Sequence, residues 1–248
     1  MFDVQQALIV LVVAFGATLL SAMSGGGSSL VSTPTWLLLG FPLPLALATN
    51  ELAGSFWTLV AARNYLRGHQ LDWRLVTVFT VCGMVGAFFG ARVVIGCDPK
   101  IIQKIIGSII VGLVIFMFLR KDFGLEATEP KVNRFFTGLT GLPLGFYEAF
   151  FGSGNGMFIC AVLTHSRGFT FRQALGYSYI LSFPWCLFAA GIYIFDGHWN
   201  LSLMIPAIIG SLCGGLLGSH IAVKNSVRFG KYLFMGVGTI LGLKLIIF

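Results

Sequence analysis

Two runs of small residues interrupt the apolar sequence, one in each half of the chain. Residues 24–29 read SGGGSS and residues 152–156 read GSGNG. Glycine lets the backbone approach a ligand closely, and serine and asparagine side chains supply hydrogen-bond donors. A helix that starts after such a run directs its unpaired N–H groups and the positive end of its dipole toward the run. The two runs therefore predict a site for an anion.

The predicted anion site takes its residues from both runs. They are Ser24, Gly25, Gly26, Gly27, Ser28 and Ser29 from the first run and Ser153, Gly154, Asn155 and Gly156 from the second. Close helix packing is the competing interpretation, because glycine and serine are also common where membrane helices touch. Broken helices at matched positions in two halves of a transporter favour the binding site.

Two polar pairs lie within apolar segments. Thr49 and Asn50 form the first pair, and Tyr177 and Ser178 occupy the matching place about 128 residues later. Polar groups at membrane depth need partners, so both pairs are expected to face the protein interior. The partner is either the substrate or another helix. The match between the two halves favours the substrate.

Two acidic residues, Glu51 and Glu148, fall within apolar segments. Burying a carboxylate in a membrane is costly, so such a residue is a functional candidate by default. Either glutamate could carry a coupling proton. The alternative is a structural carboxyl group that pairs with a cation or a hydroxyl group.

The motifs of a catalytic or metal centre are not found. Ser24 and Ser153 have no histidine or lysine placed near them by the sequence, and GSGNG does not match the G-x-S-x-G motif. No two histidines have metal-ligand spacing on one helix. We therefore predict a protein that is not an enzyme and that uses no cofactor and no metal ion.

The composition is that of a membrane protein. Hydrophobic residues make up 56% of the 248 residues and charged residues only 10%, against roughly 25% charged in soluble domains. The net charge of +7 does not indicate nucleic-acid binding, because the basic residues lie in short loops between apolar runs. The expected partners are membrane lipid, a small anion and a coupling proton.

The apolar runs predict helices separated by short loops and one polar linker, in an all-α membrane fold. The segments fall near residues 5–22, 29–39, 43–62, 74–95 and 101–119, and again near 134–151, 157–165, 173–194, 201–222 and 229–248. We divide the chain into a first transmembrane repeat (1–120), a cytoplasmic linker (121–133) and a second transmembrane repeat (134–248).

The two halves share further landmarks in the same order. Trp73 matches Trp199, and the glycines at 86 and 90 match those at 214 and 218. For these glycine pairs we favour helix packing over a binding role.

The loops indicate that the two halves are inverted with respect to each other. Basic residues surround the loop between 63 and 74, whereas the matching loop at 195–200 has none. Conversely, the turn at 41–44 has no basic residue, whereas its match carries Arg167 and Arg172. Cytoplasmic loops collect lysine and arginine, so equivalent loops face opposite sides.

Two of the segments are too short to cross a membrane. Residues 29–39 and 157–165 would reach only about half of a hydrocarbon core of about 30 Å. We expect half-helices or re-entrant hairpins that meet near the membrane midplane, because broken backbone is tolerated there only against protein or a wet cavity.

The residues assembled above resemble the TauE/SafE family of sulfite and organosulfonate transporters. The resemblance rests on SGGGSSLVSTPTWLLLGFP, the following ALATN, the loop YLRGHQLDW and the glycine-rich run at 83–91. It implies that Gly25, Gly26 and Gly27 form the family's glycine-rich stretch and that Thr49 and Asn50 form its polar pair. In the second half Asn155 interrupts the glycine run.

The resemblance implies transport of a sulfur oxyanion, an organosulfonate or a related small anion across a bacterial inner membrane. We expect a secondary transporter that works by alternating access around a midplane site. A passive anion channel is the alternative function.

Overall fold

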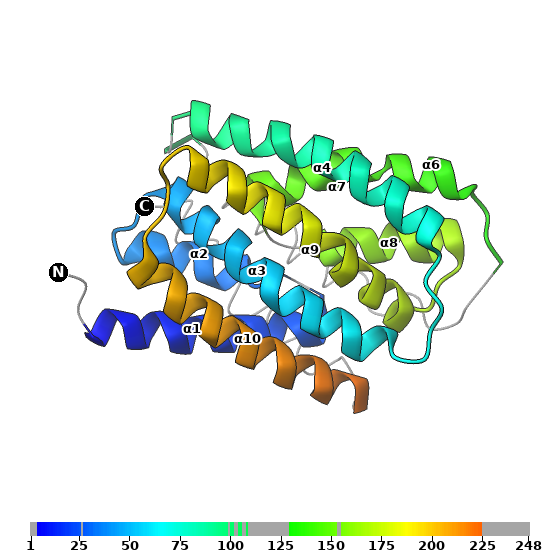
Figure 1. Cartoon of the computed structure of the whole chain (residues 1–248), viewed down its shortest axis with the longest axis horizontal. Helices are drawn as coiled ribbons and strands as arrows, with labels where there is room; N and C mark the ends of the chain where they lie inside the picture. The colour runs from blue at the N-terminus through cyan, green and yellow to red at the C-terminus, as the bar shows by residue number, and fades with distance from the viewer. Residues whose placement is uncertain are drawn as a thin grey trace.

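A computed structural model describes residues 4–25, 27–98, 100–101, 104–105, 108, 129–152 and 155–224 (Figure 1). The predicted segment at 229–248, nearly all of the one at 101–119 and most of the linker lie outside the described residues. So do three residues of the predicted site, Gly26, Ser153 and Gly154.

The described residues form helices and short connections, without a strand among them. The helices are α1 (Val4–Ser24), α2 (Ser29–Leu38), α3 (Leu43–Leu66), α4 (Trp73–Gly96), α6 (Arg134–Leu139), α7 (Gly141–Phe151), α8 (Asn155–Arg167), α9 (Phe171–Phe195) and α10 (Leu201–Lys224). The all-α prediction is confirmed, and the boundaries agree with the predicted segments to within a few residues.

The segment predicted at 134–151 differs, because it consists of two helices, α6 and α7, that meet at Thr140. Pro143 explains the break. Proline has no N–H group to donate to the carbonyl four residues earlier, and its ring collides with that carbonyl in a continuous helix.

Four of the described helices, α1, α4, α9 and α10, are long and apolar enough to cross a membrane. Their outer faces expose large apolar side chains such as Val85, Phe89, Ile209 and Leu216. Apolar side chains on the outside of a helical bundle are suited to lipid. The protein is therefore an integral membrane protein.

Glycines allow the outer helices to approach each other at backbone distance. A Cβ atom at Gly86 would overlap the carbonyl oxygen of Leu142, which joins α4 to α7. At Gly214 it would overlap the carbonyl oxygen of Phe15, which joins α10 to α1. The packing interpretation of these glycines is confirmed.

The helices run in two directions (Figure 1). The central helices α3 and α9 are antiparallel, since Gly54 faces Cys186 whereas Gly176, earlier in α9, faces Tyr65. Helices α1, α3 and α10 run one way, and α4, α7 and α9 run the other way. Each half thus places its first long helix against the last described helix of the other half.

Candidate functional site

Both glycine runs break the chain in the same way. Helix α1 is followed by Gly25 with a φ of +75°, and α7 is followed by Gly152 with a φ of +67°. This left-handed conformation is a usual way to end a helix and it favours glycine. The next helices, α2 and α8, then begin within a few residues, at Ser29 and Asn155.

The two breaks touch each other. A Cβ atom at Gly156 would lie 2.7 Å from the carbonyl oxygen of Gly25. A Cβ atom at Gly25 would lie 2.7 Å from Cδ1 of Leu175. The breaks therefore meet backbone to backbone, and glycine is required on both sides of the contact.

Two tyrosines from the central helices bind the ends of the helices that precede the breaks. The hydroxyl group of Tyr65 in α3 donates to the carbonyl of Ala22 in α1 at 2.8 Å. The hydroxyl group of Tyr193 in α9 donates to the carbonyl of Ala149 in α7 at 2.7 Å. Sequence reasoning missed this pair, although its 128-residue spacing equals that of the other matched landmarks.

A cavity of about 30 Å³ lies where the breaks meet. Nine of the residues singled out in the sequence line it, namely Gly25, Gly27, Ser28, Ser29, Asn50, Glu51, Glu148, Asn155 and Gly156. Its wall also contains polar residues that sequence reasoning missed, namely Ser21, Thr58, Tyr179, Ser182 and Cys186. The hydroxyl groups of these residues lie in apolar helix sequence, where only the tertiary structure shows which way they face.

Four predicted site residues do not line the cavity. The hydroxyl groups of Ser24, Thr49 and Ser178 donate to backbone carbonyls of their own helices. The hydroxyl oxygen of Tyr177 accepts a hydrogen bond from the backbone N–H of Asp72 at 2.8 Å. The contacts seen for these hydroxyl groups are therefore made with the backbone.

Asn50 lines the cavity, but another helix binds its amide group. Its Oδ1 atom accepts from the Ser32 hydroxyl group at 2.9 Å and from the Trp36 indole N–H at 2.8 Å. Its Nδ2 atom donates to the Thr33 hydroxyl group at 2.8 Å. Asn50 therefore fastens the short helix α2 to α3.

Asn155, the first residue of α8, has the opposite character. Its side chain is 2% exposed, and neither atom of its amide group forms a hydrogen bond with another protein group. The side chain lies beside the Glu148 carboxyl group. The hydroxyl group of Ser21 is also buried without a hydrogen-bond partner. Unpaired buried polar groups are rare in proteins, and a ligand is one explanation for them.

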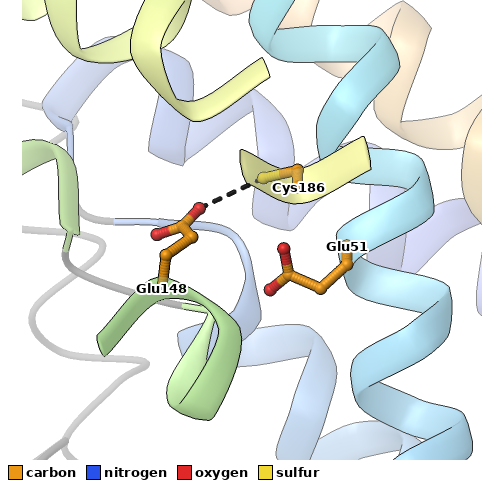
Figure 2. Close-up of side chains that lie close together, drawn as sticks. All are labelled: Glu51, Glu148 and Cys186. Carbon is orange, nitrogen blue, oxygen red and sulfur yellow. Dashed lines mark hydrogen bonds between the residues drawn. The ribbon is translucent and has the colours of Figure 1, made fainter. Parts of the chain in front are cut away.

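The two buried glutamates come together with a cysteine (Figure 2). Glu51 from α3, Glu148 from α7 and Cys186 from α9 each place one ligand-type atom within 4.8 Å of the others. The Cys186 thiol donates to Oε1 of Glu148 at 3.2 Å, and Oε2 of Glu51 has no hydrogen-bond partner. Along the described part of the chain, no lysine, arginine or histidine lines this cavity.

By distance alone these three side chains could hold a metal ion. Their chemistry is less suited to one, because hard cations prefer oxygen ligands and softer ones bind a thiolate. Here the thiol keeps its proton, since it donates a hydrogen bond to Glu148. We assign no metal ion to the site.

Comparison with known proteins places this geometry in a family context. The family described as "Sulfite exporter TauE/SafE" matches residues 10–245. A probable membrane transporter protein of Haemophilus influenzae is 25% identical over 91% of this chain and 87% of its own length. Another, from a Sinorhizobium species, is 26% identical over 95% and 90%. The Escherichia coli protein YfcA, also named a probable membrane transporter, is 21% identical over 94% and 87%. The chain therefore belongs to the sulfite exporter TauE/SafE family of membrane transporters.

Proposed function

We propose that the protein is a secondary transporter that carries a small anion across a bacterial inner membrane. Its substrate class is the sulfur oxyanions and organosulfonates, with sulfite as the first candidate. Membership of the family supports this class, and the relatives named above are bacterial and are named probable membrane transporters.

One observation carries the proposal, namely that the N-termini of α2 and α8 line the same cavity. Ser28 and Ser29 reach it from α2, and Asn155 and Gly156 reach it from α8. A helix N-terminus presents unpaired N–H groups and positive potential, so two of them can hold an anion without a basic side chain. The unpaired amide of Asn155 adds hydrogen-bond donors.

We propose an inverted repeat as the basis of alternating access. The long helices of the second half run opposite to their counterparts in the first half, and α2 and α8 lead from the cavity toward opposite ends of the protein. In transporters built this way, one half rocks against the other around a fixed central site. The two glycine breaks provide that site here.

The size of the cavity favours a carrier over a passive channel. Water needs roughly 10–15 Å³ of such space, so about 30 Å³ holds a water molecule or two and is too small for sulfite. The protein must therefore open around the breaks to admit an anion. An open channel would instead need a continuous pore.

Uptake into liposomes tests the proposed function. Purified protein is reconstituted, and entry of sulfite, thiosulfate, sulfate and methanesulfonate is measured across a range of concentrations, with empty liposomes as the control. Saturable uptake of a sulfur anion is expected. Uptake that rises linearly without saturation would support the channel, and uptake of none of the four anions would reject the sulfur-anion proposal.

Replacing Asn155 by alanine should weaken transport without weakening the fold. The amide makes no hydrogen bond within the protein, so its loss should leave the thermal unfolding midpoint unchanged or higher. Loss of an anion contact of about 1.4 kcal/mol would raise KM about tenfold. A variant with unchanged KM would show that Asn155 does not contact the anion.

A further inference from the structure

The two repeats contribute matched positions to the cavity, but the chemistry of those positions differs. Each residue of the acidic cluster has a counterpart 127 or 128 positions away in the other half, and every counterpart also lines the cavity. The counterparts are Tyr179 for Glu51, Ser21 for Glu148 and Thr58 for Cys186. One side of the cavity is therefore acidic, and the matching side has only neutral hydroxyl groups.

The charges around the cavity do not balance when an anion enters. Glu51 is 1% exposed and Glu148 is 7% exposed, and no basic side chain among the described residues lines the space. Two carboxylates and an anion in one buried cavity would repel one another with little screening by water. Binding of the anion therefore requires positive charge from another source.

We propose that Glu51 and Glu148 form a proton-binding site in which an incoming proton accompanies each monovalent anion. The inference rests on the anion transport proposed above and names the ion coupled to it. In the empty cavity the pair retains a single proton, as two adjacent carboxyl groups do when like charges meet. Anion binding brings in a second proton from water, and both are released together when the cavity opens on the other side.

The geometry supports a shared proton rather than two independent carboxyl groups. The two glutamates approach each other from different helices, α3 and α7, so a movement between the halves changes their separation (Figure 2). Gly152 lets Glu51 into the break, because a Cβ atom there would lie 2.7 Å from Oε1 of Glu51. The carboxyl pair thus touches the same backbone that is proposed to hold the anion.

The other groups that face the pair are neutral. Tyr147 from α7 and Tyr193 from α9 lie within electrostatic reach of Glu148 and Glu51 respectively, and Cys186 from α9 donates to Glu148. Helices α2 and α8 contribute serine hydroxyl groups, glycine backbone and the Asn155 amide. Protonation of the pair is therefore the charge change that these described elements can supply.

The test measures protons and anions together in liposomes that contain the full chain. Sulfite and methanesulfonate are used in parallel, with a pH-sensitive dye inside. Methanesulfonate stays ionised, so a proton that enters with it is carried by the protein. About one proton per methanesulfonate is expected, and a pH gradient of one unit should give about tenfold accumulation at most.

Glu51→Gln and Glu148→Gln keep the shape of each side chain but remove the exchangeable proton. Both variants should still exchange internal for external anion when no gradient is applied, whereas accumulation driven by the pH gradient should disappear. Glu129→Gln is the matched control, because Glu129 is exposed, and it should behave like the unchanged protein. A Cys186→Ser variant keeps the hydrogen-bond donor and should retain about one proton per anion, whereas a metal site would lose its sulfur ligand.

The outcomes separate the two proposals. Anion exchange without proton entry would overturn the proton site and leave the anion transporter standing. Retention of driven accumulation in both glutamine variants would do the same. Loss of coupling after treatment with a metal chelator would replace the proton by a metal ion. Absence of anion exchange in the unchanged protein would overturn the proposed function and the proton site together.

Discussion

Gly86→Ala is expected to lower the stability of the folded protein by about 3 kcal/mol, close to the upper end of the usual cost of overpacking. The added Cβ atom would overlap the carbonyl oxygen of Leu142 and lie 2.7 Å from the backbone nitrogen of Phe146. Both are backbone atoms of α7, so no side-chain rotation can relieve the overlap. The two helices must separate along their contact.

The matched control for this substitution is Gly191→Ala in α9. No heavy atom lies within 4 Å of the Cβ position at Gly191, so the same chemical change should be harmless. Alanine is favoured over glycine in a helix by about 0.5–1 kcal/mol. The thermal unfolding midpoints of the purified variants in detergent should fall for Gly86→Ala and stay level or rise for Gly191→Ala. Equal midpoints would show that the contact between α4 and α7 is looser than described here.

Asn50→Ala is expected to destabilise the protein by about 3 kcal/mol, at roughly 1 kcal/mol for each hydrogen bond lost. The substitution leaves the indole of Trp36 and the hydroxyl groups of Ser32 and Thr33 without their partner. Helix α2 is then no longer fastened to α3, and its N-terminus is no longer held at the cavity. We therefore expect anion transport to be lost as well.

Asn50 and Asn155 provide an internal comparison, because both are buried asparagines that line the same cavity. Asn50→Ala should lower the unfolding midpoint and abolish transport, whereas Asn155→Ala should impair transport alone. Thermal unfolding and liposome uptake, measured on the same preparations, distinguish these results. A stable Asn50→Ala protein with normal uptake would contradict the role of the three hydrogen bonds.

The positions of the helices could be predicted from local sequence because the cause is local. Long apolar runs must become helices in a membrane, where every backbone polar group needs a partner within its own segment. The breaks at Gly25 and Gly152 are equally local, since their left-handed backbone favours glycine. The proline that separates α6 from α7 was visible too, but its effect was not predicted.

The assembly of the cavity depends on contacts between residues far apart in the chain. Glu51, Glu148 and Cys186 come from three helices, and their convergence follows from the packing of α3, α7 and α9. A hydropathy pattern records which residues are apolar, but a buried helix is surrounded by protein on several sides. It therefore cannot show which neighbour a polar side chain will face.

The polar residues of the two halves show this limit most clearly. Thr49 and Asn50 are adjacent, yet Thr49 bonds to its own helix whereas Asn50 reaches across to α2. Asn155 could be singled out from its place in a glycine run, but only the folded chain leaves its amide buried without a partner. Local backbone preferences fix where the chain bends, because they act within a few residues. Hydrogen-bond partners are decided by tertiary packing, because each depends on the rotation and separation of two helices.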